Sequence, residues 1–305
     1  GAFKNLKSQL DKVTRSNGRV MLTGPAGSGK EIAARYIHAN SHRSGDPFVS
    51  VSCASIEPNK MEEVLFGTEV GGVIKSGFLE KASGGILFFD EVADMPLGTQ
   101  SKILRVLVEQ SFCRVGGTDL VRVDLRVISS TSKNLVSKIT SGDFREELFH
   151  RLNVVPVKVP SLESRREDIP ILTQHFIDKL RKTEGLPNRV FSESALTKMQ
   201  TMSWPGNIRQ LRNAVEQVLI LGPEESPVEA SELPESRQND RITKVNNVLE
   251  ENLINLPLRD AREVFEREYL MSQINRFAGN ISKTAIFVGM ERSALHRKMK
   301  TLSIV

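Results

Sequence analysis

The chain has 305 residues, of which 39% are hydrophobic and 26% charged, with a formal net charge of +5. This length predicts two or three domains, and no apolar run reaches the ~18 residues needed to span a bilayer. The start of the chain does not resemble a signal peptide. Cys53 and Cys113 are too few and too far apart for a disulfide framework or a zinc site, which favours a cytoplasmic protein without a membrane partner.

Residues 1–165 alternate β-branched apolar runs with amphipathic helical patterns. The expected strands lie at 19–24, 48–53, 85–90, 125–131 and 154–160, and helical patterns between them include 30–41 and 99–110. This alternation predicts an α/β domain with a mostly parallel sheet covered by helices.

A glycine-rich segment follows the first expected strand and opens a helix. It consists of Gly24, Pro25, Ala26, Gly27, Ser28, Gly29, Lys30 and Glu31. The segment nearly matches G-x-x-x-x-G-K-[ST], in which backbone N–H groups surround phosphates and the lysine supplies a cation. Glu31 stands where that motif places a magnesium-binding hydroxyl. A simple glycine-rich turn is the alternative, which the strand–loop–helix context disfavours.

Two carboxylates end the expected strand at 85–90. In a parallel sheet, Asp90 and Glu91 would lie at the edge that also carries the phosphate loop. Asp90 is suited to holding Mg²⁺ directly or through water, and Glu91 to polarising an attacking water. Taken alone, the pair could be a solvated strand end. Together with the loop, it indicates binding and hydrolysis of a nucleoside triphosphate such as ATP.

The pattern after residue 165 is helical. Helical periodicity at 169–185, 192–202 and 207–221 predicts a small α-helical subdomain over residues 166–222. Residues 223–256 begin with a segment rich in Pro, Glu and Ser and are expected to form a linker. A final helical domain is expected over residues 257–305.

The end of the chain is basic. Residues 269–305 contain six Lys or Arg residues and one Glu, a net +5. Residues 277–302 fit two helices joined by a turn at Gly289, with packing expected from Ile281, Ala285, Ile286, Val288, Met290, Ala294, Leu295 and Met299. The expected DNA-binding residues of the second helix are Arg292, Ser293, His296, Arg297, Lys298 and Lys300. A basic, solvated helix face is the alternative.

Several stretches together resemble the AAA+ domain of bacterial enhancer-binding regulators, the NtrC family, which act with sigma-54 RNA polymerase. They are "GPAGSGKEIAARYIHANSHR", "LFGTE", "GGILFFDEVADMPLGTQSKILRVL", "FREELFHRLNVVPVKVPSL", "REDIP" and "WPGNIRQLRN". The resemblance covers residues 19–220 and implies a P-loop sheet between helices, followed by a helical lid. This family usually has Glu after the loop lysine, so Glu31 conforms to it.

The resemblance also implies roles for individual residues. Thr131 falls where the family has a polar phosphate sensor, and Ser132 replaces an Asn that is frequent there. Arg145 and Arg151 fall on the arginines that reach the site of a neighbouring subunit in a ring. Arg209 falls on the arginine that the lid presents to the nucleotide. For each arginine alone, a surface salt bridge is the simpler interpretation.

The C-terminal block resembles the Fis-type helix-turn-helix often attached to these ATPase domains. In such modules the preceding helix dimerises, and an apolar stripe is expected here from Leu258, Ala261, Phe265 and 269–271, with an ion pair between Glu263 and Arg267 on the other side. The partners implied are DNA, a second copy through this domain, and further copies through a AAA+ ring.

One family feature is missing. Activators that remodel sigma-54 polymerase carry a "GAFTGA" loop after "LFGxE", whereas residues 65–82 read "LFGTEVGGVIKSGFLEKA" without a Phe-Thr pair. This absence resembles the NtrX-type nitrogen response regulators, some of which lack the loop. It favours a regulator that uses ATP mainly to control assembly.

Two other interpretations remain open at this point: an active ATP-hydrolysing remodeller of RNA polymerase holoenzyme, and an unrelated AAA+ nucleic-acid motor or chaperone. Family members ordinarily carry an N-terminal receiver domain, and we expect none within these residues. The sequence leaves open the operator, the ring size, the direction of regulation, and whether ATP is hydrolysed or only bound.

Overall fold

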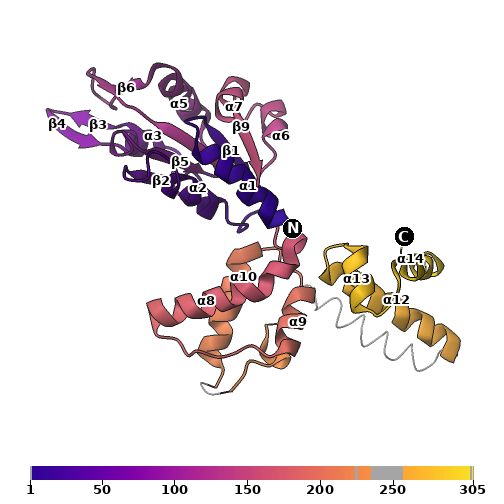
Figure 1. Cartoon of the computed structure of the whole chain (residues 1–305). Coiled ribbons are helices and arrows are strands. Elements are labelled where there is room, and N and C mark those ends of the chain that lie inside the picture. The colour runs from indigo at the N-terminus through magenta and orange to yellow at the C-terminus, as the bar shows by residue number, and fades with distance from the viewer. Residues whose placement is uncertain (1, 224–225, 235–256, 303, 305) are drawn as a thin grey trace. The chain divides into compact units, whose positions relative to one another are not determined.

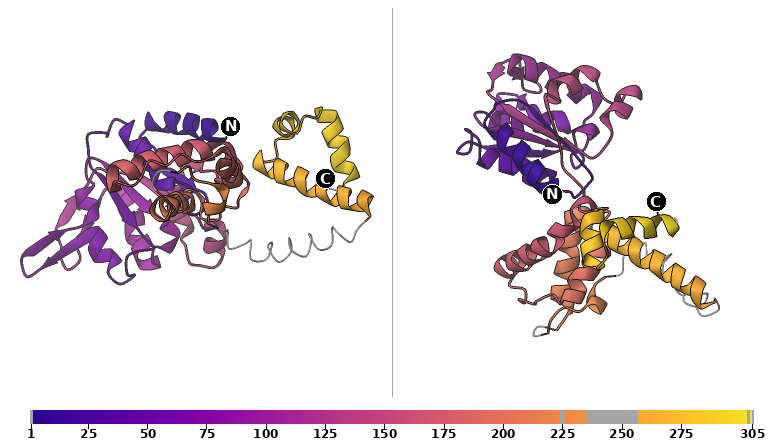
Figure 2. Two further views of the ribbon diagram at one scale, coloured as in Figure 1. Left: turned by 90° about the horizontal axis from the view of Figure 1, so that it is seen from below. Right: turned by 45° about the vertical axis from the view of Figure 1, so that its right-hand side comes forward.

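The computed structural model describes residues 2–223, 226–234, 257–302 and 304, except the side chains of residues 2, 258, 260 and 261. The chain divides into two compact units, residues 1–161 and 162–305. Figures 1 and 2 show the α/β unit and the helices of the second unit. The expected fold class, a P-loop parallel sheet with a helical lid and a helix-turn-helix domain, is confirmed.

The first unit is built on a five-stranded parallel sheet in the order β2-β5-β8-β1-β9. Its strands are β1 (Val20–Thr23), β2 (Phe48–Ser52), β5 (Ile86–Asp90), β8 (Arg126–Thr131) and β9 (Val155–Lys158). Each strand begins and ends within two residues of its expected bounds. Because all five run in parallel, their carboxyl ends share one edge of the sheet. β1 pairs with β8, and Thr23 lies opposite Thr131 at this edge.

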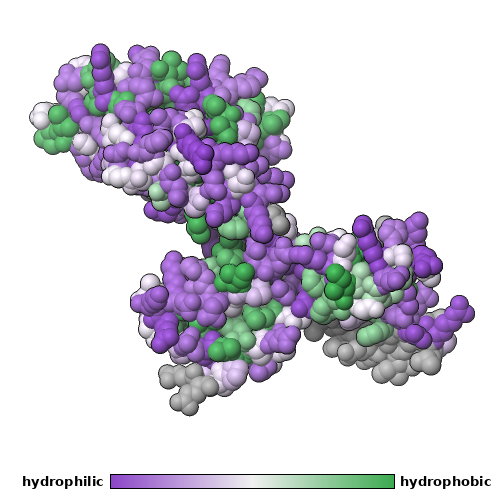
Figure 3. Space-filling model, in the orientation of Figure 1, coloured by the Kyte–Doolittle hydropathy of each residue, from purple (hydrophilic) through white to green (hydrophobic). Residues whose placement is uncertain are grey.

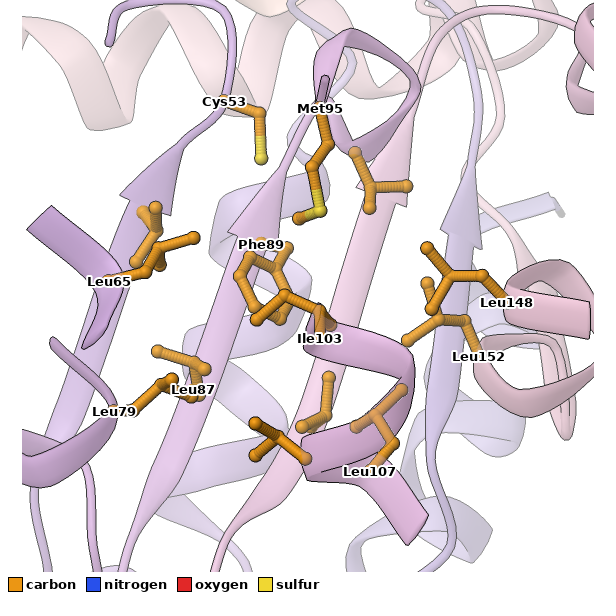
Figure 4. Packing of buried hydrophobic residues seen from close by; sticks show 14 of the residues in the cluster. Cys53, Leu65, Leu79, Leu87, Phe89, Met95, Ile103, Leu107, Leu148 and Leu152 are labelled. Carbon is orange, nitrogen blue, oxygen red and sulfur yellow. The ribbon is translucent and has the colours of Figure 1, made fainter. Parts of the chain in front are cut away.

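Helices cover both faces of this sheet, as the alternation of strand and helix patterns predicts. Val20, Leu22 and Phe88 face a core completed by the first two helices. Met21 and Phe89 face the opposite core, where the later helices pack (Figure 4). The helices of this unit are α1 (Ala2–Thr14), α2 (Lys30–Ala39), α3 (Met61–Phe66), α4 (Phe78–Lys81), α5 (Leu97–Glu109), α6 (Leu135–Thr140) and α7 (Glu146–Leu152), with a 3₁₀ turn at Val92–Asp94.

Two short hairpins, which the sequence did not predict, project from this unit. They are β3 (Gly67–Val70) with β4 (Val73–Ser76), and β6 (Ser111–Cys113) with β7 (Leu120–Arg122). Gly71 and Gly72 both have positive φ, 59° and 81°, as a two-residue primed turn requires. The first hairpin therefore closes tightly at the segment that lacks the family's loop, and its tip exposes 69% of Val70. Figure 3 shows hydrophobic atoms at this end of the unit.

The second unit begins with a helical bundle. It contains a 3₁₀ segment (Glu163–Asp168), α8 (Ile169–Glu184), α9 (Glu193–Thr201) and α10 (Asn207–Leu221), close to the expected helices. Trp204 is buried in its core, and its indole N–H donates to Met199 O at 2.8 Å. Residues 226–234, expected to belong to the linker, instead pack on this bundle. Val228 is fully buried and forms an isolated β-bridge with Phe191, and Ala230–Glu232 forms a 3₁₀ turn. Residues 235–256, the rest of the expected linker, lie outside the described part.

The C-terminal residues form α12 (Leu258–Arg276), α13 (Ile281–Phe287) and α14 (Arg292–Thr301). Their own core contains Leu270, Ala285, Leu295, Met299 and Leu302. The expected packing role of Ile286 is wrong, because its side chain is 82% exposed. Thr284 is buried in that helix instead, and its hydroxyl is satisfied by the carbonyl of Asn280 at 2.9 Å. Gly289, at φ 69°, lies in the turn between α13 and α14.

Candidate nucleotide site and DNA-binding helix

The glycine-rich loop lies between β1 and α2. Gly24 passes so close to β9 that a Cβ atom there would lie 2.3 Å from the Val159 carbonyl oxygen. Its N–H donates to Thr131 O at 3.3 Å, which ties the loop to β8. Gly29 starts α2 with φ 101°, so Lys30 is the first helical residue. The unpaired N–H groups of a helix start therefore lie beside the lysine, an arrangement suited to an anion.

Lys30 and Glu91 form an ion pair across the sheet edge. Lys30 Nζ lies 3.0 Å from Glu91 Oε1, and only 5% and 18% of the two side chains are exposed. The same ammonium donates to the carbonyls of Gly24 at 3.0 Å and Pro25 at 3.4 Å. The first strand–helix junction and the end of β5 are thus joined through one cation, as the parallel sheet predicts.

Two serines at the end of β8 hold the two carboxylates. Ser130 Oγ donates to Asp90 Oδ1 at 2.5 Å, and Glu91 Oε2 accepts from both the N–H and the hydroxyl of Ser132, at 2.8 and 2.9 Å. Between them, buried Thr131 accepts from the Lys133 N–H at 3.0 Å. Sequence reasoning did not single out Ser130, and it treated Ser132 only as the replacement of an Asn. Serine is too common in proteins to signal such a role.

The electrostatics of this cluster keep Glu91 ionised. Burial raises the pKa of Glu91, but the hydrogen bonds from Ser132 and Lys30 lower it by more. The pKa of Glu91 therefore lies below its usual range. Nearby, burial and the charges of Asp90 and Asp94 raise the pKa of the Cys53 thiol to about 12. The Asp94 carboxylate itself pairs with Lys133. The edge therefore carries a set of fixed charges in a partly water-excluded position.

Asp90 is the residue expected to hold a metal. Within the described ranges, no group of three or more His, Cys, Asp or Glu side chains is arranged to hold an ion by itself. Asp90 ends β5 beside the loop, which fits a cation that takes its remaining ligands from phosphate oxygens and water.

None of the helices whose residues the structure describes could cross a membrane.

The remaining expected nucleotide residues differ in their exposure and partners. Glu31 pairs with Arg35 at 2.8 Å on an exposed face of α2. Arg145, the N-cap residue of α7, and Arg151, in its last turn, are both exposed. Arg209 is exposed on α10 of the second unit. Pro25 and Ala26 lie at the exposed tip of the loop, and Ser28 is buried inside it.

Gln100 is a residue of this region that the sequence did not reveal. Its fully buried side-chain amide donates to the carbonyls of Met95 at 2.8 Å and Asp143 at 3.0 Å. Its Oε1 accepts from the Arg145 N–H at 2.8 Å. One buried glutamine therefore fixes the backbone that starts α7.

In the C-terminal domain, α14 presents most of the expected DNA-binding residues to solvent. Arg292, Ser293, His296, Arg297 and Lys300 are exposed, and Leu295 and Met299 are buried beneath them. Lys298 differs, because its Nζ lies 2.7 Å from Glu266 Oε2 on α12.

The preceding helix also differs in detail from expectation. The expected Glu263–Arg267 pair is wrong: Arg267 Nε donates to Leu302 O at 2.8 Å, and Arg262 pairs with Glu266. Leu270 is buried, whereas Phe265, Tyr269 and Met271 are exposed. The side chains of residues 258 and 261 lie outside the described part.

Known protein families match three successive parts of the chain. The family described as "Sigma-54 interaction domain" matches residues 1–158, "AAA+ ATPase lid domain" matches 163–248, and "Bacterial regulatory protein, Fis family" matches 261–302. The nitrogen assimilation regulatory protein NtrX of Azorhizobium caulinodans is 53% identical over 99% of this chain and 67% of that protein. The regulatory protein AtoC of Escherichia coli is 36% identical over 99% of this chain and 66% of its own length.

Among solved structures, NtrX from Brucella abortus in complex with ATP is 51% identical, with a TM-score of 0.84 over 99% of this chain and 68% of that one. The same protein in complex with ADP gives the same identity and TM-score. The chain thus spans about two thirds of the length of these relatives, and as little as 64% of several NtrX-like proteins from Rickettsia.

Proposed function

Because the chain belongs to the NtrC family of sigma-54-associated transcription regulators and resembles its NtrX-type members, we propose that it is an ATP-controlled, sequence-specific DNA-binding regulator. ATP binding at Lys30 would control self-assembly of the AAA+ unit, and α14 would read DNA in the bacterial cytoplasm. The observation that carries this proposal is the meeting of Lys30, Asp90 and Glu91 at one sheet edge, in a chain that also ends in a helix-turn-helix.

The residues present fit a nucleotide with its metal. The loop passes so close to the end of β9 that only glycine can occupy position 24, and Gly29 leads directly into the first turn of α2, where helix N–H groups suit an anion. Lys30 would hold the terminal phosphates, and Asp90 would hold Mg²⁺ directly or through water. ATP with its metal supplies a transferable phosphoryl group when bound. The role of Glu91 would be to orient and polarise water, and Thr131 would sense the phosphate.

Assembly would complete the site. Arg145 and Arg151 are exposed cations at the two ends of α7, and guanidinium groups keep their charge and can contact phosphate oxygens in a fixed planar geometry. We assign them to the site of a neighbouring subunit in a ring, and Arg209 to the nucleotide of its own subunit. In mixtures, Glu91→Ala and Arg151→Ala chains should restore some hydrolysis to each other. If Arg151→Ala left concentration-dependent hydrolysis unchanged, the assignment would be wrong.

The short β3–β4 hairpin argues against the usual remodelling of polymerase. A two-residue turn at residues 71–72 leaves no room for the projecting Phe-Thr tip, although the hairpin does expose Val70, Val73 and Ile74. The alternative function is an active sigma-54 activator. Transcription from a sigma-54 promoter in vitro separates the two: we expect DNA binding without open-complex formation, and robust ATP-dependent open complexes would contradict the proposal.

DNA binding would require a dimer. Phe265 and Tyr269 stack with ring centroids 6.1 Å apart on α12 and are 63% and 41% exposed, which suits a helix that pairs with a second copy. Two α14 helices would then read half-sites about one DNA turn apart. Footprinting on genomic fragments tests this spacing, and Phe265→Asp should convert a two-site footprint into weak single-site binding.

A further inference from the structure

The two carboxylate oxygens of Glu91 are held by different partners. Oε1 pairs with Lys30 at 3.0 Å, while Oε2 accepts two hydrogen bonds from Ser132, at 2.8 and 2.9 Å. The residue also has φ 53° and ψ 55°, in the left-handed region that non-glycine residues rarely adopt. A carboxylate intended to polarise water is therefore fixed to the protein on both sides.

The ammonium group of Lys30 also has a partner for each of its donors. It has three N–H donors, and its three close acceptors are Gly24 O, Pro25 O and the Glu91 carboxylate. A phosphate oxygen that approaches Lys30 must replace one of them. The two carbonyls belong to a loop whose backbone is tied to Thr131 O. Glu91 is a side chain that can rotate, and its negative charge repels a phosphate, so it is the acceptor that gives way.

We propose that Glu91 and the terminal phosphates of a nucleotide compete for Lys30, and that Ser132 is the positioning residue on which Glu91 remains anchored when the lysine is taken. This inference rests on the proposed nucleotide site. Arrival of phosphate frees Oε1 to accept a hydrogen bond from water, while Oε2 stays on the end of β8. Glu91 is thereby withheld from water until a phosphate occupies Lys30.

The competition predicts a gain of affinity from mutations that weaken it. In EDTA, which prevents metal-dependent hydrolysis, isothermal titration should show ATP binding about five-fold more tightly to Glu91→Gln than to wild type, as expected for loss of the ion pair that competes for Lys30. Ser132→Ala, which removes one of the two bonds to Oε2, should tighten binding about two-fold, and Ser132→Thr should restore the wild-type value. A purely structural defect would weaken binding instead.

Two controls make the result specific. Asp94→Asn removes a negative charge from the same turn, but Asp94 pairs with Lys133, so ATP affinity should not change. AMP has no phosphate that reaches Lys30, so Glu91→Gln should leave AMP affinity unaltered. Equal ATP affinity in wild type, Glu91→Gln and Ser132→Ala would overturn the competition. If Lys30→Ala also bound ATP as wild type does, the proposed nucleotide site itself would be wrong.

Discussion

The side-chain Oε1 of Gln100, on α5, accepts a hydrogen bond of 2.8 Å from the backbone N–H of Arg145, the residue that begins α7. Gln100→Ala would leave that N–H and the carbonyls of Met95 and Asp143 without this partner. We expect a loss of about 1–3 kcal/mol in the free energy of unfolding. Misplacement of Arg145 should also lower assembly-dependent hydrolysis by about ten-fold. Urea denaturation and hydrolysis at saturating protein concentration measure the two effects.

The matched control for Gln100 is a neighbour on the same helix. The Ser101 hydroxyl donates to Leu97 O in an exposed position, so Ser101→Ala should change stability by less than ~0.5 kcal/mol and leave hydrolysis as it was. Equal effects of the two substitutions would show that the hydrogen bonds of Gln100 do not position the start of α7.

Arg114, in the loop between β6 and β7, pairs with Glu69 on β3 of the other hairpin and with Glu80 on α4. It donates to Glu80 at 2.8 and 3.0 Å and to Glu69 at 3.1 Å, and these hydrogen bonds lower the pKa of Glu80 below its usual range. A carboxylate with a lowered folded-state pKa stabilises the fold above its unfolded pKa of about 4.3, and the contribution disappears as the pH falls through the folded value. Arg114→Met should therefore lower Tm at pH 7 by about 2–4 °C, and the difference from wild type should shrink below pH 4.

A second arginine provides the comparison. Arg105 pairs with Glu109 at i,i+4 on the exposed face of α5, with 73% of its side chain exposed. Arg105→Met should shift Tm by less than about 1–2 °C at any pH, because solvent screens such pairs. A pH-independent loss in Arg114→Met would mean that packing of its aliphatic part, and not the carboxylates, holds the hairpins together.

The sequence predicted the features that repeat along the chain. The five parallel strands are β-branched runs between amphipathic helices, so the sheet and the meeting of Lys30 with Asp90 and Glu91 followed from topology. It could not predict contacts that depend on single polar side chains from distant elements, such as Ser132 with Glu91. The mistaken packing of Ile286 has a related cause: α13 has seven residues, too few for apolar periodicity to choose between adjacent positions.

The two cysteines should differ sharply in reactivity. Cys53 is 2% exposed and packs in the sheet core (Figure 4), and burial is the main cause that raises its thiol pKa to about 12. Cys113 is exposed on β6. Because the thiolate is the reactive form, iodoacetamide at pH 8 should modify Cys113 at least about 100-fold faster. Peptide mass spectrometry measures both rates, and both residues should react alike in guanidinium chloride. Comparable rates in the folded protein would contradict the buried position of Cys53.

The basic residues of α14 should not contribute equally to DNA binding. Arg297 is exposed, whereas Lys298 is held 2.7 Å from Glu266. We expect Arg297→Ala to weaken operator binding about five- to ten-fold and to reduce the slope of log affinity against log salt by about 1. Lys298→Ala should reduce that slope by less than half as much, because its charge is already paired. Glu266→Gln should strengthen binding slightly, since it frees Lys298 and removes a negative charge. Fluorescence anisotropy at several salt concentrations compares the three variants, and equal slopes for Arg297→Ala and Lys298→Ala would show that Lys298 leaves Glu266 for a phosphate on DNA.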